Sequence, residues 1–424
     1  MKRSALMVPL LLAVAACRPG EPGPRPLPPR PPVGDLPASE PLVRVGIAVD
    51  SGSVTVTSPT PFVIHRAGGG ELAGGRAGEP WTVTADAAGR VEARAPDGRT
   101  TGWQDVMLRV IAGGGIIQIG DRQFRGEALL RAGSSGTVTA INVVDMERYL
   151  LGVVPREIGR RPIDEMAAMK AQAVAARTYA IGNMGGREAH GFDFYATVLD
   201  QVYGGIADED SLVSRAVEET RGEIVTYQGL PILAYYSSTC GGRTAAIEDS
   251  WPTRAPLPYL RSVSDRMPGS DEAYCSTSSR FEWTTSWTRD QLLAVLGETL
   301  RAHTRGTVTS ARRVQNVELV DRNRSGRATV GITVDGRTYS LRADAVRWVL
   351  RPSPGPAILN SSLLDRVRAT VRDGEVRELE IGGGGWGHGI GMCQVGAMGR
   401  ARAGHSYQQI LTAYYTGTEI IRLY

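Results

Sequence analysis

The chain has 424 residues, of which 42% are hydrophobic and 22% are charged. These values are those of an ordinary globular protein with two or three domains, or of one large domain with an appended module. The formal net charge of +4 is too small and too dispersed to indicate nucleic-acid binding. The 52 glycines and 25 prolines indicate many turns, and therefore β-rich segments with short connections.

The first 41 residues read as a targeting segment and a tether. Lys2 and Arg3 precede an apolar run, and Val-Ala-Ala-Cys at 14–17 fits a bacterial lipobox. We therefore expect a lipoprotein signal peptide over 1–17, with Cys17 as the lipidated residue. An ordinary cleaved secretory signal with a chance cysteine is the alternative. Residues 18–41 are rich in proline and predict an extended tether.

Short alternating apolar runs separated by glycines follow, as in Val54-Thr-Val-Thr57 and Trp81-Thr-Val-Thr84. This period of two predicts β-strands. The sequence therefore predicts a β-rich module over 42–123, with no cluster of residues that suggests chemistry.

The stretch 141–181 combines apolar residues with isolated charges. Glu157 follows Val153-Val-Pro155, and an alanine-rich helix is expected from Pro162 to Ile181. A carboxyl group at a turn between apolar elements is one whose pKa burial can raise enough for acid catalysis. The competing interpretation is a surface glutamate on a connecting loop.

Further along, a helix is expected to end at Glu219, and two strands are expected to pair across Gln228-Gly229 as a hairpin. Thr288 and Gln291 are spaced as a capping box for the helix 290–300, and residues 314–350 read as strands. The C-terminal part contains Gly-Trp-Gly-His-Gly-Ile-Gly-Met-Cys-Gln at 385–394.

Several of these pieces resemble the SpoIID/LytB family, which comprises stage II sporulation protein D and amidase enhancers. The resemblance rests on Asn-Val-Val-Asp-Met-Glu-Arg-Tyr-Leu-Leu-Gly-Val-Val-Pro-Arg-Glu at 142–157, Met-Ala-Ala-Met-Lys-Ala-Gln-Ala-Val-Ala-Ala-Arg-Thr-Tyr-Ala at 166–180, Gln-Val-Tyr-Gly-Gly at 201–205, Ser-Thr-Cys-Gly-Gly-Arg-Thr at 238–244 and the glycine-rich block that contains His388. It spans residues 124–424, and the strands before it match loosely. It implies an α+β fold: a β-rich SpoIID-like domain with a central buried alanine-rich helix, preceded by a β-rich segment.

The resemblance also implies an activity, that of a lytic transglycosylase on peptidoglycan. The family's essential glutamate falls on Glu157, which would protonate the bond between N-acetylmuramic acid and N-acetylglucosamine. Its carboxylate would then take a proton from the muramic C6 hydroxyl, and the product would be a 1,6-anhydro sugar. One residue serves both steps, so a second carboxylate is not required.

Neutral and basic side chains in the matching motifs are expected to contact the glycan. For His388, the alternative is that it merely caps a tight glycine turn, and for Arg177, that its charge reaches solvent. The expected glycan-binding residues are Lys170, Arg177, Tyr179, Gln201, Tyr203, Ser238, Thr239, His388 and Gln394. A cleft is expected where the Glu157 loop meets the His388 loop.

No metal and no cofactor are expected. Some family members resemble a zinc protein with Cys and His before the Gln-Val-Tyr motif, but residues 190–201 contain no cysteine here. Cys240, Cys275, Cys393 and His388 offer zinc ligands, although no pair has the close spacing of common structural sites. In an oxidising envelope, a disulfide between Cys240 and Cys275 is the favoured expectation.

Three functions are compared. The favoured one is a lipid-anchored lytic transglycosylase that acts on glycan strands, including strands stripped of stem peptides. We expect it on the extracytoplasmic face of the membrane. In a two-membrane bacterium, Arg18 beside Cys17 favours the outer membrane. The second is a non-catalytic glycan-binding enhancer of a cell-wall amidase, which would then be a partner. The third is a structural envelope lipoprotein that holds peptidoglycan.

Overall fold

A computed structural model describes residues 36–105, 107–304 and 311–424. Within these residues the chain folds into two compact units, and Trp283–Gly383 forms one of them. The other unit contains residues 36–282 and Gly384–Tyr424, so the smaller unit is inserted into the larger one. Cys17 and most of the tether lie outside the described residues. Helices and strands in several sheets make this an α+β protein, as the sequence predicts.

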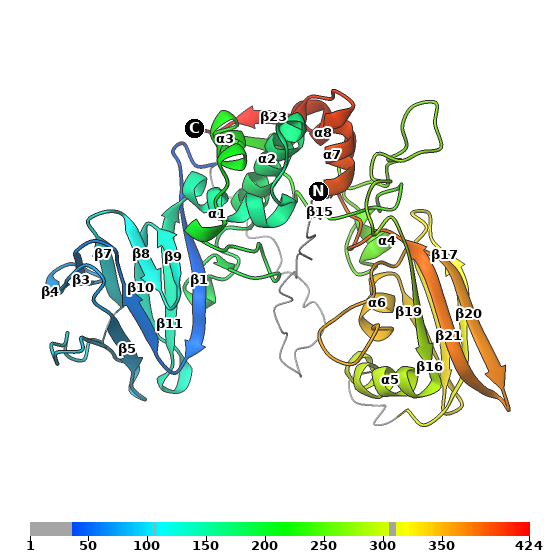
Figure 1. Ribbon diagram of the computed structural model, residues 1–424, viewed down its shortest axis with the longest axis horizontal. Coiled ribbons are helices and arrows are strands. Elements are labelled where there is room, and N and C mark those ends of the chain that lie inside the picture. The colour runs from blue at the N-terminus through cyan, green and yellow to red at the C-terminus, as the bar shows by residue number, and fades with distance from the viewer. Residues whose placement is uncertain (1–35, 106, 305–310) are drawn as a thin grey trace, which may run out of the picture. The chain divides into compact units, whose positions relative to one another are not determined.

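The larger unit begins with two packed β-sheets (Figure 1). The first sheet has the order β12-β1-β11-β10-β7-β3-β4, formed by Phe194–Tyr195, Leu42–Ser51, Val138–Asp145, Glu127–Ala132, Leu108–Ala112, Phe62–Arg66 and Glu71–Gly75. The second has the order β6-β5-β2-β8-β9, formed by Val91–Arg94, Trp81–Ala85, Val54–Thr57, Ile116–Ile119 and Arg122–Arg125. Alternate residues point inward, so Val54, Val56, Trp81 and Val83 are buried between the sheets. The strands expected between 42 and 123 are thereby confirmed.

Helix α2 (Met166–Asn183) is the centre of the helical part, as expected for the alanine-rich segment. It contacts α1 (Met146–Ile158), α3 (Ser211–Glu219), α7 (Gln394–Arg402), α8 (Tyr407–Tyr414) and β13 (Glu223–Tyr227). Its small side chains allow close approach on several sides, and 13 of its 18 residues are buried. In Figure 1 the red C-terminal helices lie beside α2, although more than 200 residues separate them in sequence.

Short elements complete the larger unit. The hairpin at Gln228-Gly229 is confirmed, because β13 pairs with β14 (Leu230–Pro231) and both turn residues have positive φ. The other elements are β15 (Tyr236–Ser237), β22 (Met392–Cys393), β23 (Glu419–Arg422), α4 (Ile247–Ser250) and the 3₁₀ turns η1 (Ser134–Gly136), η2 (Ile163–Glu165), η3 (Glu188–His190) and η4 (Ile206–Asp208).

The inserted unit has its own hydrophobic core, built on two three-stranded sheets and two helices. The elements are β16 (Glu282–Thr288), β20 (Leu364–Arg372), β21 (Glu375–Gly384), β17 (Val314–Arg322), β18 (Ala328–Val334), β19 (Arg337–Arg342), α5 (Arg289–His303) and α6 (Asp344–Val349). The capping box of Thr288 and Gln291 at the start of α5 is confirmed. The interpretation of 314–350 as strands alone is wrong at its end, where α6 forms.

Two further expectations need correction. Glu157 does not lie on a turn; it belongs to the last turn of α1, which continues through Pro155 to Ile158. The long helix begins four residues later than expected, at Met166, because residues 163–165 form a 3₁₀ turn after Pro162.

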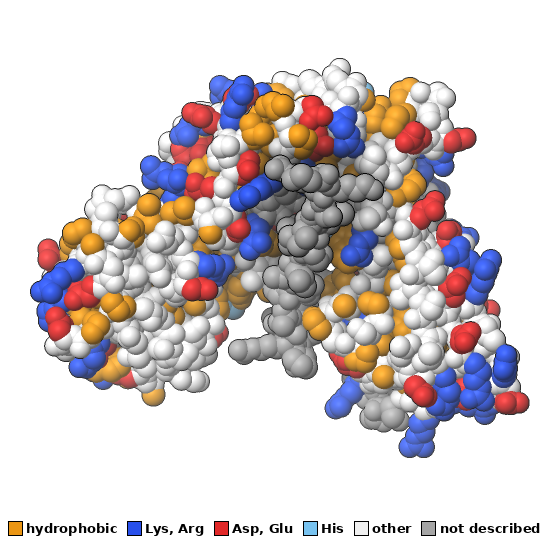
Figure 2. Space-filling model, in the orientation of Figure 1, with side chains coloured by type: hydrophobic (Ala, Val, Ile, Leu, Met, Phe, Trp, Pro, Cys, Tyr) orange, Lys and Arg blue, Asp and Glu red, His pale blue; other side chains and the backbone are white. Residues whose placement is uncertain are grey.

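No helix within the described residues has both the length and the apolar composition that crossing a membrane requires. Acidic and basic side chains are interspersed over most of the face seen in Figure 2.

Candidate active site around Glu157

Helix α1 carries Glu157 at its C-terminal end. Asp145 caps the start of the helix by accepting a hydrogen bond from the Arg148 backbone N–H (3.0 Å). The end is fixed by Gly159, whose N–H donates to the carbonyl of Pro155 (3.0 Å). A proline in a helix lacks an N–H donor, and here the helix ends only three residues beyond it. Glu157 therefore occupies a defined position on a short final turn.

The carboxyl group of Glu157 is removed from water, although the residue as a whole is only partly buried. Burial raises its pKa from the ordinary 4.5 to about 7. Two hydrogen bonds oppose this shift, one from the backbone N–H of Val202 to Oε1 (3.3 Å) and one from the side chain of Gln394. No cationic side chain is among the causes of the shift, and desolvation is the largest of them. The carboxyl group therefore gains and loses its proton near neutral pH.

The Val202 N–H is held in place by its neighbour Gln201. The Gln201 amide accepts a hydrogen bond from Tyr149 (3.2 Å) and donates one to the hydroxyl of Tyr236 (3.0 Å). Tyr203, on the other side, donates to Asn142 (2.9 Å). Gln201 and Tyr203 are both 1% exposed, so they act here as buried supports of the loop beside Glu157.

Three tyrosines lie near enough to the carboxyl group to feel its charge. Burial raises the pKa of Tyr149, Tyr179 and Tyr236, and the charge of Glu157 contributes to the rise in each. Their hydroxyl groups therefore stay protonated and can donate hydrogen bonds. Tyr179, on α2, lies 6.2 Å from Tyr235 between ring centres. Stacking faces and neutral donors of this kind suit a sugar ligand.

Gln394 connects the C-terminal motif to this group. Its amide donates to the backbone carbonyl of Glu157 (3.0 Å) and to Gln172 on α2 (3.3 Å). It is the first residue of α7, so this helix is fixed against the end of α1. The structure thus brings together Glu157, Tyr179, Gln201 and Gln394 from the sequence-derived set.

His388 lies next to aromatic rings in the same unit. Its ring centre is 5.0 Å from Trp251 and 6.1 Å from Tyr235. Its Nδ1 accepts a hydrogen bond from the Ile390 N–H (3.0 Å), so the neutral ring carries its proton on Nε2. Tyr235 contacts both His388 and Tyr179, so its ring links the histidine to the tyrosines near Glu157.

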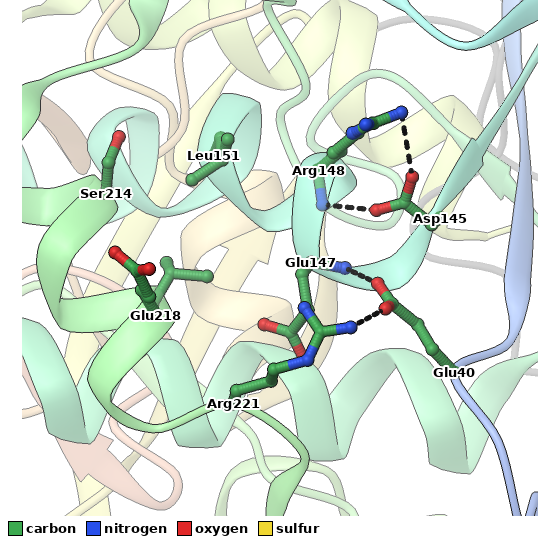
Figure 3. A pocket seen from close by; sticks show the side chains of 9 residues that line it. Glu40, Asp145, Glu147, Arg148, Leu151, Ser214, Glu218 and Arg221 are labelled. Atoms are coloured by element: carbon green, nitrogen blue, oxygen red, sulfur yellow. Dashed lines mark hydrogen bonds and ion pairs between the residues drawn. The ribbon is translucent and has the colours of Figure 1, made fainter. Parts of the chain in front are cut away.

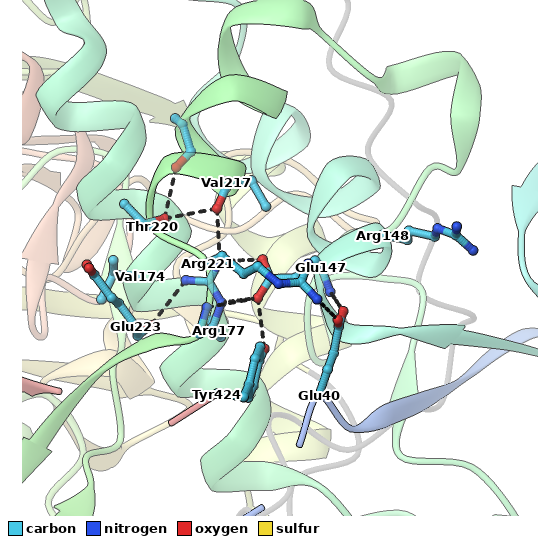
Figure 4. A network of polar contacts seen from close by, with 12 residues as sticks. Glu40, Glu147, Arg148, Val174, Arg177, Val217, Thr220, Arg221, Glu223 and Tyr424 are labelled. Carbon is cyan, nitrogen blue, oxygen red and sulfur yellow. Dashed lines mark hydrogen bonds and ion pairs between the residues drawn. The ribbon is translucent and has the colours of Figure 1, made fainter. Parts of the chain in front are cut away.

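Two predicted glycan-binding residues on α2 are engaged elsewhere. Lys170 forms an ion pair with Glu219 (2.5 Å) and lies 5.8 Å from the ring centre of Tyr407. Arg177 is 0% exposed, and its guanidinium makes two bonds to Glu147 (2.8 and 2.6 Å) (Figure 4). No surface of Arg177 is open to a ligand in this arrangement, and a role for either residue in glycan binding stays a prediction.

Ser238 and Thr239 directly precede Cys240, and Ser238 lies near Cys393. Thr239 is 1% exposed and shares a hydrogen bond with Ser278 (2.8 Å). The Ser238 carbonyl accepts from the Val395 N–H (3.0 Å), which again ties the loop to α7.

A pocket of about 510 Å³ opens at the other end of α1 (Figure 3). Its charged groups satisfy one another: Arg221 pairs with Glu40, and Glu40 also accepts from the backbone N–H of Glu147 (2.9 Å). These bonds hold the segment that leads into β1 against the helix. The pocket therefore has a structural explanation, and it does not contain Glu157.

Sequence reasoning missed two contributors to the Glu157 environment. The Val202 N–H is a backbone group, which no side-chain pattern reveals. Tyr236 follows an apolar strand segment, and only its hydrogen bond to Gln201 shows that its hydroxyl faces this group.

The fold and this geometry define a class: an α+β protein in which a helix presents one desolvated glutamate among neutral donors. A family model described as "Stage II sporulation protein" matches residues 134–227, which include Glu157. A second model, described as a domain of unknown function, matches residues 267–391.

Curated relatives agree with the first match. An uncharacterized protein of Brachyspira hyodysenteriae is 33% identical over 67% of this chain and 69% of its own length. A protein named "Amidase enhancer" from Bacillus subtilis is 31% identical over 64% of this chain, but only 40% of that longer protein is covered. "Stage II sporulation protein D" from Bacillus subtilis is 28% identical over 66% of this chain and 76% of its own length. The chain belongs to the SpoIID/LytB family.

Proposed function

We propose that this chain is a lytic transglycosylase that cleaves peptidoglycan glycan strands, with Glu157 as both acid and base. The observation that carries the proposal is the desolvated Glu157 carboxyl group, whose pKa is about 7. Near neutral pH, a group with this pKa exists in both its protonated and its deprotonated form. A residue that must first donate and then accept a proton requires both forms.

The proposed reaction balances on one residue. Protonated Glu157 donates its proton to the glycosidic oxygen, and the bond from that oxygen to C1 of N-acetylmuramic acid breaks. The carboxylate then removes the proton of the C6 hydroxyl while O6 bonds to C1. The 1,6-anhydro sugar leaves, and Glu157 is protonated again. The Val202 N–H stabilises the carboxylate between the two steps, since it already donates to Oε1.

The tyrosines and His388 are the proposed glycan contacts. Tyr179 is 7% exposed and lies among the rings near Glu157, and His388 is partly exposed beside Trp251. Aromatic faces stack on sugar rings, and the Nε2–H of a neutral histidine donates to a sugar hydroxyl. Gln201 and Gln394 would act from behind these groups by fixing the loop and the helix.

The place of action belongs to the same proposal. We propose that residues 1–17 are removed, that Cys17 carries the lipid anchor, and that residues 18–41 tether the folded part to a membrane outside the cytoplasm. Residues 42–123 would form a docking or scaffold module. Replacing Cys17 with alanine should abolish incorporation of labelled fatty acid and release the protein into the soluble envelope fraction; incorporation by the variant would contradict the anchor.

A second candidate is a non-catalytic enhancer of a cell-wall amidase. The similarity to the Bacillus subtilis protein named "Amidase enhancer" favours it. In that case the same groups would bind glycan, Glu157 would contribute at most a hydrogen bond, and an amidase would be the partner.

The experiment that separates the two is mass spectrometry of peptidoglycan, intact and amidase-stripped, after incubation with the protein. Glu157→Gln is compared with Glu209→Gln, a control that removes a carboxylate elsewhere, from the partly buried ion pair with Arg125. Under the proposal, 1,6-anhydro products form with the native protein and with Glu209→Gln and are absent with Glu157→Gln. Glycan binding without any such product, together with a faster reaction of an added amidase, would establish the enhancer instead.

A further inference from the structure

Three cysteines and one aspartate from three separate segments meet in the larger unit. Cys240 follows β15, Asp265 and Cys275 lie in the long loop before β16, and Cys393 ends β22. One ligand atom from each residue lies within 4.8 Å of the others. All four residues are buried, with Asp265, Cys275 and Cys393 at 0% exposure. We propose that this cysteine cluster is a structural zinc site, with three thiolates and the Asp265 carboxylate as ligands.

Two distances within the cluster match those expected around a tetrahedral zinc ion. Zinc–sulfur bonds of about 2.3 Å and a zinc–oxygen bond of about 2.0 Å place sulfur atoms about 3.8 Å apart and sulfur and oxygen about 3.5 Å apart. The Sγ atoms of Cys240 and Cys275 are 3.6 Å apart, and Sγ of Cys240 is 3.5 Å from Oδ2 of Asp265. These two separations are those of neighbouring ligands in a zinc tetrahedron, and the remaining ligand atoms lie within 4.8 Å.

The groups around the cluster orient its ligands. Asp265 accepts hydrogen bonds at Oδ1 from Tyr414 (2.6 Å) and Arg400 (3.2 Å), which leaves Oδ2 directed at the sulfur atoms. Sγ of Cys393 accepts from the backbone N–H groups of Cys240 (3.2 Å) and Gly396 (3.3 Å). Such outer partners are typical of metal sites, where they fix the ligands and stabilise thiolate charge.

Electrostatics favours a cation among these residues. Three thiolates and one carboxylate carry four negative charges, and Arg400 supplies one positive charge at 3.2 Å from Asp265. A divalent cation removes two more negative charges and satisfies all four ligands together. The mixture of sulfur and carboxylate oxygen suits zinc, and four protein ligands leave no open position, as in structural zinc sites.

A disulfide is the competing outcome for the same residues. Cys240 and Cys275 are free in the structure, and their 3.6 Å separation exceeds the bond length of about 2.05 Å. Bridging them would leave the Cys393 thiol and Oδ2 of Asp265 facing the bridge. The expected Cys240–Cys275 pairing stays a prediction, and the zinc proposal requires that it does not form.

A zinc ion here would help to fix the position of Glu157, because one of its ligands is adjacent in sequence to a residue that contacts Glu157. Cys393 directly precedes Gln394, whose amide donates to the Glu157 carbonyl. The ion would also join the loop after β15 to the start of α7. The site is separate from the residues before the Gln-Val-Tyr motif, where the zinc of other family members is expected.

The first test measures metal in the full chain carrying Cys17→Ser, which leaves only the three cluster thiols among its cysteines. The protein is reduced, offered zinc and dialysed. We expect one zinc per chain, an X-ray absorption spectrum with three sulfur atoms at about 2.3 Å and one oxygen at about 2.0 Å, and a thiolate-to-metal charge-transfer band after cobalt replaces zinc. Zinc content no higher than that of a Cys275→Ser variant would overturn the proposal.

Variants that keep the shape of the site guard against misfolding. Asp265→Asn retains an acceptor for Tyr414 and should weaken zinc binding by about tenfold or more. Asp193→Asn is the control, because Asp193 is also buried and paired with an arginine, Arg44, but lies outside the cluster; it should retain full zinc. Equal zinc affinity of the two variants would exclude the carboxylate ligand.

Peptide mapping of the protein from its own envelope, alkylated without reduction, completes the test. We expect three alkylated thiols once the metal is chelated, and a disulfide between any two of them would overturn the proposal. None of these measurements uses enzymatic activity, so the zinc site and the transglycosylase proposal can fail independently.

Discussion

Replacing Glu157 with glutamine should stabilise the larger unit above neutral pH and leave its stability unchanged in acid. The folded protein holds the Glu157 proton up to a pKa of about 7, whereas the unfolded chain releases it near 4.5. Between these values the folded state binds more protons, so its stability falls as pH rises. The loss is absent below pH 4.5 and complete above about pH 7, where the glutamate is a buried charge and glutamine is neutral.

The magnitude follows from the shift. Raising the pKa from 4.5 to about 7 is a change of about 2.5 units, and each unit is worth about 1.36 kcal/mol, which gives an upper limit of about 3.4 kcal/mol. Local relaxation and water penetration around a buried carboxylate reduce this, and we expect about 2 kcal/mol at pH 8.

Hydrogen exchange in urea at pH 4.5 and pH 8, each corrected for the intrinsic exchange rate, provides the assay. Peptides of α2 report the larger unit, and peptides of α5 report the inserted unit, which lacks Glu157 and serves as an internal reference. Glu209→Gln, which removes one partner of a partly buried ion pair, should not stabilise the protein. Equal effects of Glu157→Gln at the two pH values, or destabilisation at pH 8, would refute the desolvation of this carboxyl group.

Three further outcomes are expected. Formation of 1,6-anhydro products should decline about tenfold per pH unit above about pH 7, as Glu157 loses the proton it must donate; a constant rate to pH 9 would exclude it as the acid. Glu147→Gln should lower the free energy of unfolding by about 3–5 kcal/mol, because it removes the charge partner of fully buried Arg177. In thermal denaturation, the double variant that also carries Arg177→Met should recover part of the lost stability. No recovery would argue against the energetic importance of this pair. Gly396→Ala should lower the free energy of unfolding by about 1–3 kcal/mol, because its Cβ would lie 2.2 Å from the Tyr414 hydroxyl. Gly297→Ala, whose Cβ would have no atom within 4 Å, should instead stabilise α5 by up to about 1 kcal/mol. Similar effects of the two substitutions on urea unfolding would contradict the packing argument.

The sequence predicted local structure well where a short pattern determines it. The strands of the first module, the hairpin at Gln228-Gly229 and the capping box at Thr288 each depend on residues within a few positions. The α+β class and the buried alanine-rich helix were also predicted. The position of Glu157 is not predictable in this way, because a proline such as Pro155 indicates the end of an apolar segment, whereas α1 continues through it for three more residues.

Long-range placement is where the sequence was insufficient. Arg177 lies in a conspicuous motif, yet its partner Glu147 is 30 residues away and both are buried. The cysteines have no close spacing, so only the fold reveals that Cys240 and Cys393, 153 residues apart, are neighbours. Their proximity depends on tertiary contacts that no local pattern encodes.

The insertion of Trp283–Gly383 into the larger unit determines the order in which the chain can fold during synthesis. The chain leaves and re-enters the larger unit at one place, where the Gly385 N–H donates to the Phe281 carbonyl (3.1 Å). The larger unit cannot complete its core before α7 and α8 are made, because Met392, Ile410 and Tyr414 fill it. The inserted unit can fold first, as a contiguous segment, while α2 still exposes apolar surface.

At about 5–20 residues per second, synthesis of the insert keeps that surface open for about 5–20 s. During this interval the exposed apolar surface makes the nascent chain prone to aggregation. A chain terminated before residue 384 would contain a complete inserted unit and a larger unit whose core lacks α7 and α8.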